Sequence, residues 1–158
     1  MRYVQDYHVV PIQTPVASAG STALNAVTSP GVNMSNYEWC DFVVHFGNLE
    51  DAAVTLLVTN STASTSVSAL AIPFAYRVSA TVGADTLGTL TTCDSAGLAC
   101  ATTYTDKMVI ICVDPKRMDD GYPYVHLYQT QAAGSEALQS AMAILFPKYA
   151  QTTPLSST

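Results

Sequence analysis

Side chains that could transfer protons are few in this sequence and are poorly spaced for catalysis. Asp41 and His45 lie four residues apart in a strand-like run, which places both side chains on one side of the strand, about 13 Å apart. This separation is too long for an acid–base dyad, so we interpret His45 as a partly buried strand residue or an interface histidine. His8 and His126 have no Ser or Cys nucleophile in a recognisable motif nearby. The sequence therefore predicts no catalytic triad and no enzymatic activity.

Carboxylates occur in two adjacent pairs, Glu50 with Asp51 and Asp119 with Asp120. Glycosidases use two carboxyl groups, but both of these pairs lie in turn sequence, where acidic residues serve as solvated turn formers. The pairs also lack the alternating oxygen ligands of a calcium-binding loop. The glycines are scattered and precede no predicted helix, so no phosphate-binding loop is expected. We expect no catalytic acid pair and no cofactor.

The four cysteines, Cys40, Cys93, Cys100 and Cys112, are not spaced as zinc ligands. Zinc sites need close pairs such as C-x2-C, whereas six residues separate Cys93 from Cys100 and the other two stand alone. Residues 1–11 contain no apolar segment as long as that of a secretory signal, so we expect the chain to stay in the cytoplasm that makes it. The sequence predicts no metal site and free thiols, with a Cys93–Cys100 pair as the open alternative.

A low charge content distinguishes this chain from an average soluble domain. Of its 158 residues 49% are hydrophobic and only 11% are charged, where about a quarter is usual. The net charge of −6 and the pI near 4.6 leave no electrostatic footprint for binding nucleic acid. No apolar run approaches the ~18 residues of a membrane span, so no membrane partner is expected. The length fits one domain, and an uncharged surface favours coverage of part of it by a partner.

The elements that would position these side chains are β-strands. Runs rich in β-branched and aromatic residues lie at 39–46, 54–59, 69–78, 107–113, 122–130 and 138–146. Pro73 confines the third run to a sheet edge or a bulge. The near-continuous apolar run 107–113 predicts a central strand buried on both faces, and 122–130 is expected to follow it in an antiparallel pair. The pattern predicts an all-β fold, either an antiparallel β-sandwich or a barrel-like domain.

Other segments of the body are predicted less directly from pattern. The spacer 48–53 suits a hairpin connection, and residues 93–104 are rich in small side chains and indicate a loop. The run 138–146 also satisfies the helical period of 3.6, but we interpret it as a strand. We therefore expect a β-rich domain over residues 37–149 with a polar C-terminal tail at 150–158.

Residues 1–36 are typical of an extended N-terminal arm, because several Pro and Gly residues interrupt any helical or alternating pattern. The first dozen residues still carry strand-like apolar side chains, which can pair at an open sheet edge. An arm of this kind gains little by folding back on itself. We expect residues 1–30 to contact a neighbouring subunit and to stay outside the core of their own domain.

Aromatic residues suggest where such contacts lie. Tyrosine predominates, with nine Tyr against four Phe and one Trp, and its ring offers a rigid contact face with a hydroxyl group. The alternative is that these rings fill alternating strand positions with their hydroxyls bonded at the sheet margin. Arg77, one of only six basic residues, is expected to pair with an acid. The candidate interface residues are Tyr3, Val4, Tyr7, Val9, Ile12, Tyr76, Arg77, Tyr122 and Tyr124.

The order and spacing of several segments carry a resemblance to a known family. These segments are N-Y-x-W-C-D-F-V-V at 36–44, V-T-L at 54–56, A-I-P-F-x-Y-R at 71–77, M-D-D-G-Y-x-Y-V-x-L at 118–127 and P-K-Y at 147–149. In this order the chain resembles the small head decoration, or cement, proteins of tailed double-stranded DNA bacteriophages. It departs from them in the Cys93–Cys100 excursion and in the proline-bearing tail after Tyr149.

The resemblance implies a β-rich domain that sits on an assembled capsid lattice, often as a homotrimer, and clamps neighbouring major capsid protein subunits. It implies no catalytic residues and no cofactor. The expected function is therefore that of a virion structural protein that is made in the host cytoplasm and ends on the capsid surface. The alternatives are a phage neck or tail adaptor, or another binding module such as a carbohydrate-binding β-sandwich.

Overall fold

The computed structural model describes residues 7–17, 27–49, 54–65, 69–131 and 137–149. These residues form strands joined by turns and by three short 3₁₀ helices, η1 (Met34–Asn36), η2 (Thr102–Tyr104) and η3 (Pro115–Arg117). The strands are β1 (His8–Ala17), β2 (Val27–Thr28), β3 (Val32–Asn33), β4 (Tyr37–Leu49), β5 (Val54–Ser61), β6 (Leu70–Ile72), β7 (Phe74–Val78), β8 (Thr91–Cys93), β9 (Leu98–Cys100), β10 (Met108–Val113), β11 (Tyr124–Gln131) and β12 (Ala137–Pro147).

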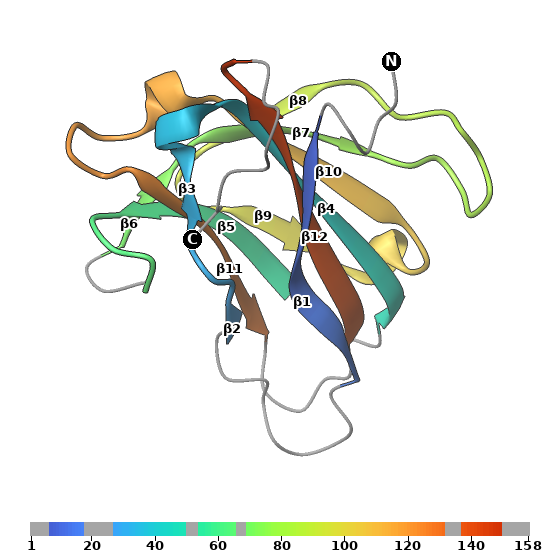
Figure 1. Cartoon of the computed structure of the whole chain (residues 1–158). Coiled ribbons are helices and arrows are strands. Elements are labelled where there is room, and N and C mark those ends of the chain that lie inside the picture. Colours follow the sequence, from blue (N-terminus) through green and yellow to red (C-terminus); the bar gives the residue numbers. More distant parts are fainter. Residues whose placement is uncertain (1–6, 18–26, 50–53, 66–68, 132–136, 150–158) are drawn as a thin grey trace.

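Two antiparallel sheets pack against each other, which confirms the predicted β-sandwich (Figure 1). Sheet A has the order β1-β12-β4-β10-β7-β8. Sheet B has the order β2-β11-β5-β6, with β3 also on β11 and β9 also on β5. Between the sheets lies the core, to which alternate residues of each strand contribute. Its largest fully buried side chains include Tyr37, Phe42, Phe46, Phe74 and Leu127.

The predicted strands are present, but two of their partners differ from expectation. β10 is central as predicted, because it lies between β4 and β7. Only alternate residues of β10 are buried, so the strand is not buried on both faces. The strand predicted at 122–130 pairs with β5 in sheet B and not with β10. The spacer 48–53 likewise joins sheet A to sheet B and closes no hairpin, because β4 and β5 belong to different sheets.

Pro73 marks a change of sheet within the third predicted strand. The residues before it form β6, which pairs with β5 in sheet B, whereas those after it form β7, which pairs with β10 in sheet A. Proline lacks the N–H that a continuous ladder requires, so the strand divides at this residue. Residues 93–104 were expected to form a loop. They contain β9 and the end of β8, short strands that pair with β5 and β7.

The N-terminal segment belongs to its own sandwich in the part that is described. β1 pairs along its length with β12, and Ile12 is only 6% exposed within the core. His8 Nδ1 lies 2.9 Å from the Tyr37 hydroxyl, and Val32 is buried as well. These observations correct the expectation that residues 1–30 stay outside the core, because the free edge of β12 already offers the pairing that the arm needs. Tyr3, Val4 and the predicted tail at 150–158 lie outside the described residues.

Candidate binding surface

The side of sheet A that points away from the core carries apolar side chains across five neighbouring strands. Every second residue of a strand faces this side, and the strand register aligns these residues in rows. One row crosses β1, β12, β4, β10 and β7 with Pro11, Met142, Val43, Ile110 and Arg77. The next row contains Val9, Ile144, Asp41, Cys112 and Ala75. Together with Tyr7, Trp39, His45, Met108, Ser140 and Phe146, these residues form what we call the outer face of sheet A.

Few of these side chains suit contact with water. Only four of the sixteen are charged or small and polar, namely Asp41, His45, Arg77 and Ser140. Val9 and Met142 are 46% and 43% exposed although they are aliphatic. Antiparallel sheets that face water on one side normally carry polar residues there. The outer face of sheet A is therefore suited to contact with protein.

Asp41 is the one acidic residue on this face, and neighbouring side chains of the face donate hydrogen bonds to its carboxyl group. The Trp39 indole Nε1 donates a hydrogen bond to Asp41 Oδ1 at 2.8 Å. Burial raises the pKa of the Asp41 carboxyl, while hydrogen bonds from Trp39 and Cys112 lower it. Arg77 was expected to pair with an acid, and its Nη1 instead donates to the Gly88 carbonyl at 3.2 Å. The face thus carries one carboxylate and one guanidinium on different strands, β4 and β7.

A loop at 79–90 overhangs one end of the outer face of sheet A. Between this loop and the sheet lies a hollow of about 360 Å³, lined by Val43, His45 and Met142 among others. The loop adds exposed aliphatic groups, because Val82 is 71% exposed and Leu90 is 50% exposed. The recess itself is mixed in character, because Ser79, Thr81 and Asp106 also line it.

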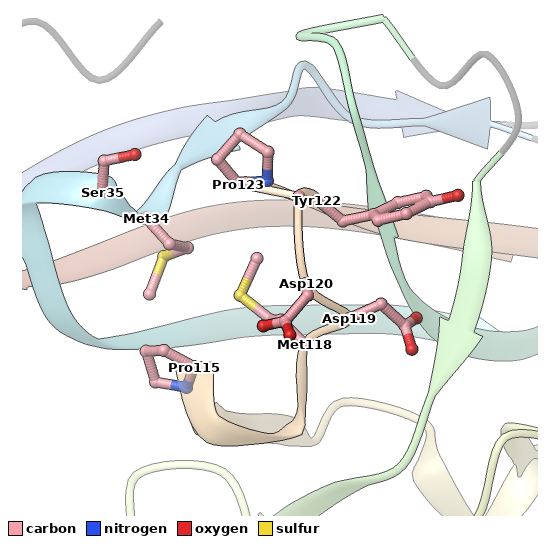
Figure 2. A pocket seen from close by; sticks show the side chains of 9 residues that line it. Met34, Ser35, Pro115, Met118, Asp119, Asp120, Tyr122 and Pro123 are labelled. Atoms are coloured by element: carbon pink, nitrogen blue, oxygen red, sulfur yellow. The ribbon is translucent and has the colours of Figure 1, made fainter.

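A second hollow, of about 410 Å³, lies between η1 and η3. Figure 2 shows the side chains of Met34 and Met118 between Pro115 and Pro123, while Tyr122 points away from them. Asp119 and Asp120 also line this hollow, and Asp119 Oδ2 accepts a hydrogen bond from Asn60 Nδ2 at 3.1 Å. The hollow therefore combines an apolar floor with two carboxyl groups.

A Ser–His pair that the sequence did not indicate lies on the opposite sheet. Ser61 Oγ on β5 lies 2.7 Å from His126 Nε2 on β11, and His126 Nδ1 lies 3.1 Å from the Ser29 carbonyl. Both side chains are completely buried, and the partner of the second ring nitrogen is a backbone carbonyl in place of a carboxylate. A nucleophile must reach its substrate, and this hydroxyl is closed off by the chain around Gly31. The pair serves as an internal hydrogen-bonded support.

The cysteines are free in the structure, as predicted. Burial raises the pKa of all four thiols, and it raises the pKa of Cys100 and of Cys112 to about 12. The nearby Asp41 carboxyl contributes to the shift at Cys112. Because the thiolate is the nucleophile, these groups are unreactive near neutral pH. Among the residues described, no three His, Cys, Asp or Glu side chains are close enough together to hold a metal ion.

The predicted interface residues separate into four locations. Tyr7, Val9 and Arg77 lie on the outer face of sheet A, where the Tyr7 and Phe146 rings are 4.7 Å apart. Ile12 lies in the core and Tyr76 packs against it, so neither is presented to another subunit. Tyr122 borders the hollow beside η3, and Tyr124 lies on the outer side of sheet B opposite Ser61.

Most of the outer face of sheet A was missed at the level of sequence, although a signal for it exists. β10 has the run M-V-I-I-C-V, and the second half of β12 has A-M-A-I-L-F, with apolar residues at both alternate sets of positions. Such runs are typical of strands covered on both sides. The run at 107–113 predicted burial on both sides, whereas among the described residues only one side of β10 is buried in the core.

No protein-family model, curated protein or solved structure matches this chain. Within the part of the chain that is described, no helix has the length and apolar character needed to cross a bilayer.

Proposed function

We propose that this protein is a non-catalytic structural subunit whose outer face of sheet A is covered by protein in the working assembly. The observation that carries this proposal is the pair of rows that cross five strands with eight uncharged, mostly apolar residues and only two charged ones, Asp41 and Arg77. Apolar surface of this extent is stabilised by removal from water, at about 25 cal/mol for each Å² buried. The low charge content of the chain supports the same function, because unpaired charges are costly to bury in large contacts.

The assembly that we propose is the capsid of a tailed bacteriophage, with this protein as a decoration or cement subunit bound to the major capsid protein. The order of segments from 36 to 149 and their resemblance to head decoration proteins support this assignment. The alternative is a neck or tail adaptor, which would bind a ring of subunits and leave the capsid shell bare.

Binding to capsids tests the proposal directly. Purified protein is mixed with capsids that lack it, and the mixture is sedimented and analysed for bound copies. We expect saturable binding at a fixed number of copies per capsid, and we expect Val43→Lys to weaken it at least tenfold, because a lysine at the centre of this apolar face must be desolvated in whichever protein contact the assembling subunit makes there.

Thr130→Lys is the matched control, because Thr130 is also β-branched and partly exposed but lies on the outer side of sheet B. This variant should bind as the unmodified protein does. Absence of capsid binding by the unmodified chain would contradict the capsid assignment. Equal binding by both variants would show that the outer face of sheet A takes no part.

A further inference from the structure

We propose that the outer face of sheet A packs against the same face of a second copy of this chain, around a two-fold axis. The inference rests on the proposed function only in that this face is covered by protein. It names the partner as the chain itself.

Solubility before assembly favours a second copy over the capsid as the occupant. On a single subunit free in solution, an uncovered apolar face of this extent would face water. Interfaces that form permanently between identical chains are the most apolar class and resemble a domain core cut in half. The outer face of sheet A has this character, with Val43, Ile110 and Met142 in one row.

The charges on the face complement each other in a two-fold arrangement. Asp41 lies on β4 beside Cys112 of β10, and Arg77 lies on β7 beside Ile110 of the same β10 strand. Strands about 4.8 Å apart with about 3.3 Å per residue place Asp41 and Arg77 roughly 12 Å apart. A two-fold axis between the stacked faces that crosses β10 midway sets each Asp41 over the partner's Arg77. The free-energy cost of burying the Asp41 carboxylates and the Arg77 guanidinium groups is then offset by two reciprocal ion pairs.

The edges of sheet A are poor alternatives for association. The outermost strand on one side, β1, contains Pro11 and Pro15, which have no N–H to offer to an added strand. On the other side β8 has only three residues. Association of two copies is therefore directed to the face of the sheet.

The flat area of the face can be compared with that of a stable pair. Five strands with about five to seven residues along each span roughly 20 Å by 16 to 23 Å, on the order of 300 to 450 Å² of flat surface. Standard interfaces bury about 800 Å² of accessible surface on each partner, a measure that also counts the relief of the side chains. The overhanging loop adds the exposed side chains of Val82, Leu87 and Leu90.

Sedimentation velocity of the full chain at micromolar concentration measures the predicted pair. We expect a mass of twice 16.7 kDa for the unmodified protein and for Thr130→Lys. Val43→Lys should sediment at 16.7 kDa with an unchanged β-rich circular dichroism spectrum, which corresponds to an increase of at least about 100-fold in the dissociation constant.

Exchange of the two charges tests the two-fold geometry without a new charge at the centre of the face. Asp41→Arg and Arg77→Asp should each weaken the pair at least tenfold, because like charges then face each other. The double variant should restore the dissociation constant to within a few-fold of the unmodified value.

The sedimentation results test the two-fold pair independently of whether the protein binds capsids. A monomer, a trimer, or a double variant as weak as the single ones would overturn the two-fold pair, even if the protein binds capsids. A dimer that dissociates on Val43→Lys and recovers in the charge exchange would support the pair, even if no capsid binding is found.

Discussion

The two outer sides of the sandwich differ in chemistry although both are built from antiparallel strands. On sheet A this side is mostly aliphatic and aromatic. On sheet B the corresponding side of β5 and β11 carries mainly hydroxyl groups and an imidazole: Thr55, Leu57, Thr59, Ser61, Tyr124, His126, Tyr128 and Thr130. The polar side suits water and hydrogen bonds with the chain's own loops, whereas the apolar side is the one that we propose is covered by another protein.

The two outer sides also differ in how closely a loop of the chain covers them. Residues 29–31 close over His126 with backbone hydrogen bonds, since Ser29 N donates to the Leu127 carbonyl and Gly31 N donates to the Ser64 carbonyl, both at 2.9 Å. Over sheet A, the loop at 79–90 leaves a hollow of about 360 Å³ beneath it. Residues 29–31 thus close the part of sheet B around His126, although Leu57, Thr59 and Tyr128 border a further hollow of about 330 Å³ on that side.

The largest expected effect compares one histidine from each side. His126→Ala removes a fully buried ring with two hydrogen-bond partners, so we expect the free energy of unfolding to fall by about 3 kcal/mol. His45→Ala on the exposed outer face of sheet A should change it by less than about 0.5 kcal/mol. Denaturant unfolding of the two variants measures both values. Similar losses in both would show that the side of sheet B is no better closed than that of sheet A.

A glycine from each covering loop gives the next comparison. A Cβ at Gly31 would lie 2.6 Å from His126 Cε1 and 2.8 Å from the Ser64 carbonyl oxygen, so Gly31→Ala should cost about 2 kcal/mol through overpacking. Gly83 in the overhanging loop has nothing within 4 Å, and its φ of +76° alone should make Gly83→Ala cost about 1 kcal/mol. Thermal unfolding ranks the two. A larger loss at Gly83 would contradict the looser cover described for sheet A.

The smallest expected effect is on the labelling rate of Cys112, a thiol on the outer face of sheet A. Cys112 is half-buried with a pKa raised to about 12, so its labelling by a thiol reagent should be slow and should rise about tenfold per pH unit below that value. The sign follows because only the thiolate reacts, and its fraction increases with pH.

Coverage of the face adds a second control on the same thiol. Val43→Lys should accelerate labelling of Cys112 at constant pH, whereas Thr130→Lys should not. Mass spectrometry of digested protein locates the label, and Cys112→Ser confirms the assignment. Labelling of Cys112 that is insensitive to Val43→Lys would indicate that the face is open in solution.

Local pattern predicted the strands but not their neighbours. The dense β-branched and aromatic residues of 39–46 and 54–59 fix extended backbone wherever they lie, and both strands were found. Partner choice depends on contacts far apart in sequence, so the pairing of β11 with β5 was missed. The turn at 119–121 is compatible with either pairing, and only the packing of two sheets selects one.

Composition and alternation by themselves determined that this chain is an all-β domain with little charge. Tertiary structure decided which apolar residues lie inside. Ile12 and Val9 sit on the same segment and are similar in type, yet one is in the core and the other is 46% exposed. The physical reason is that adjacent strand residues point to opposite sides of a sheet, and the stacking of sheet B on only one side of sheet A decides which of those sides is buried.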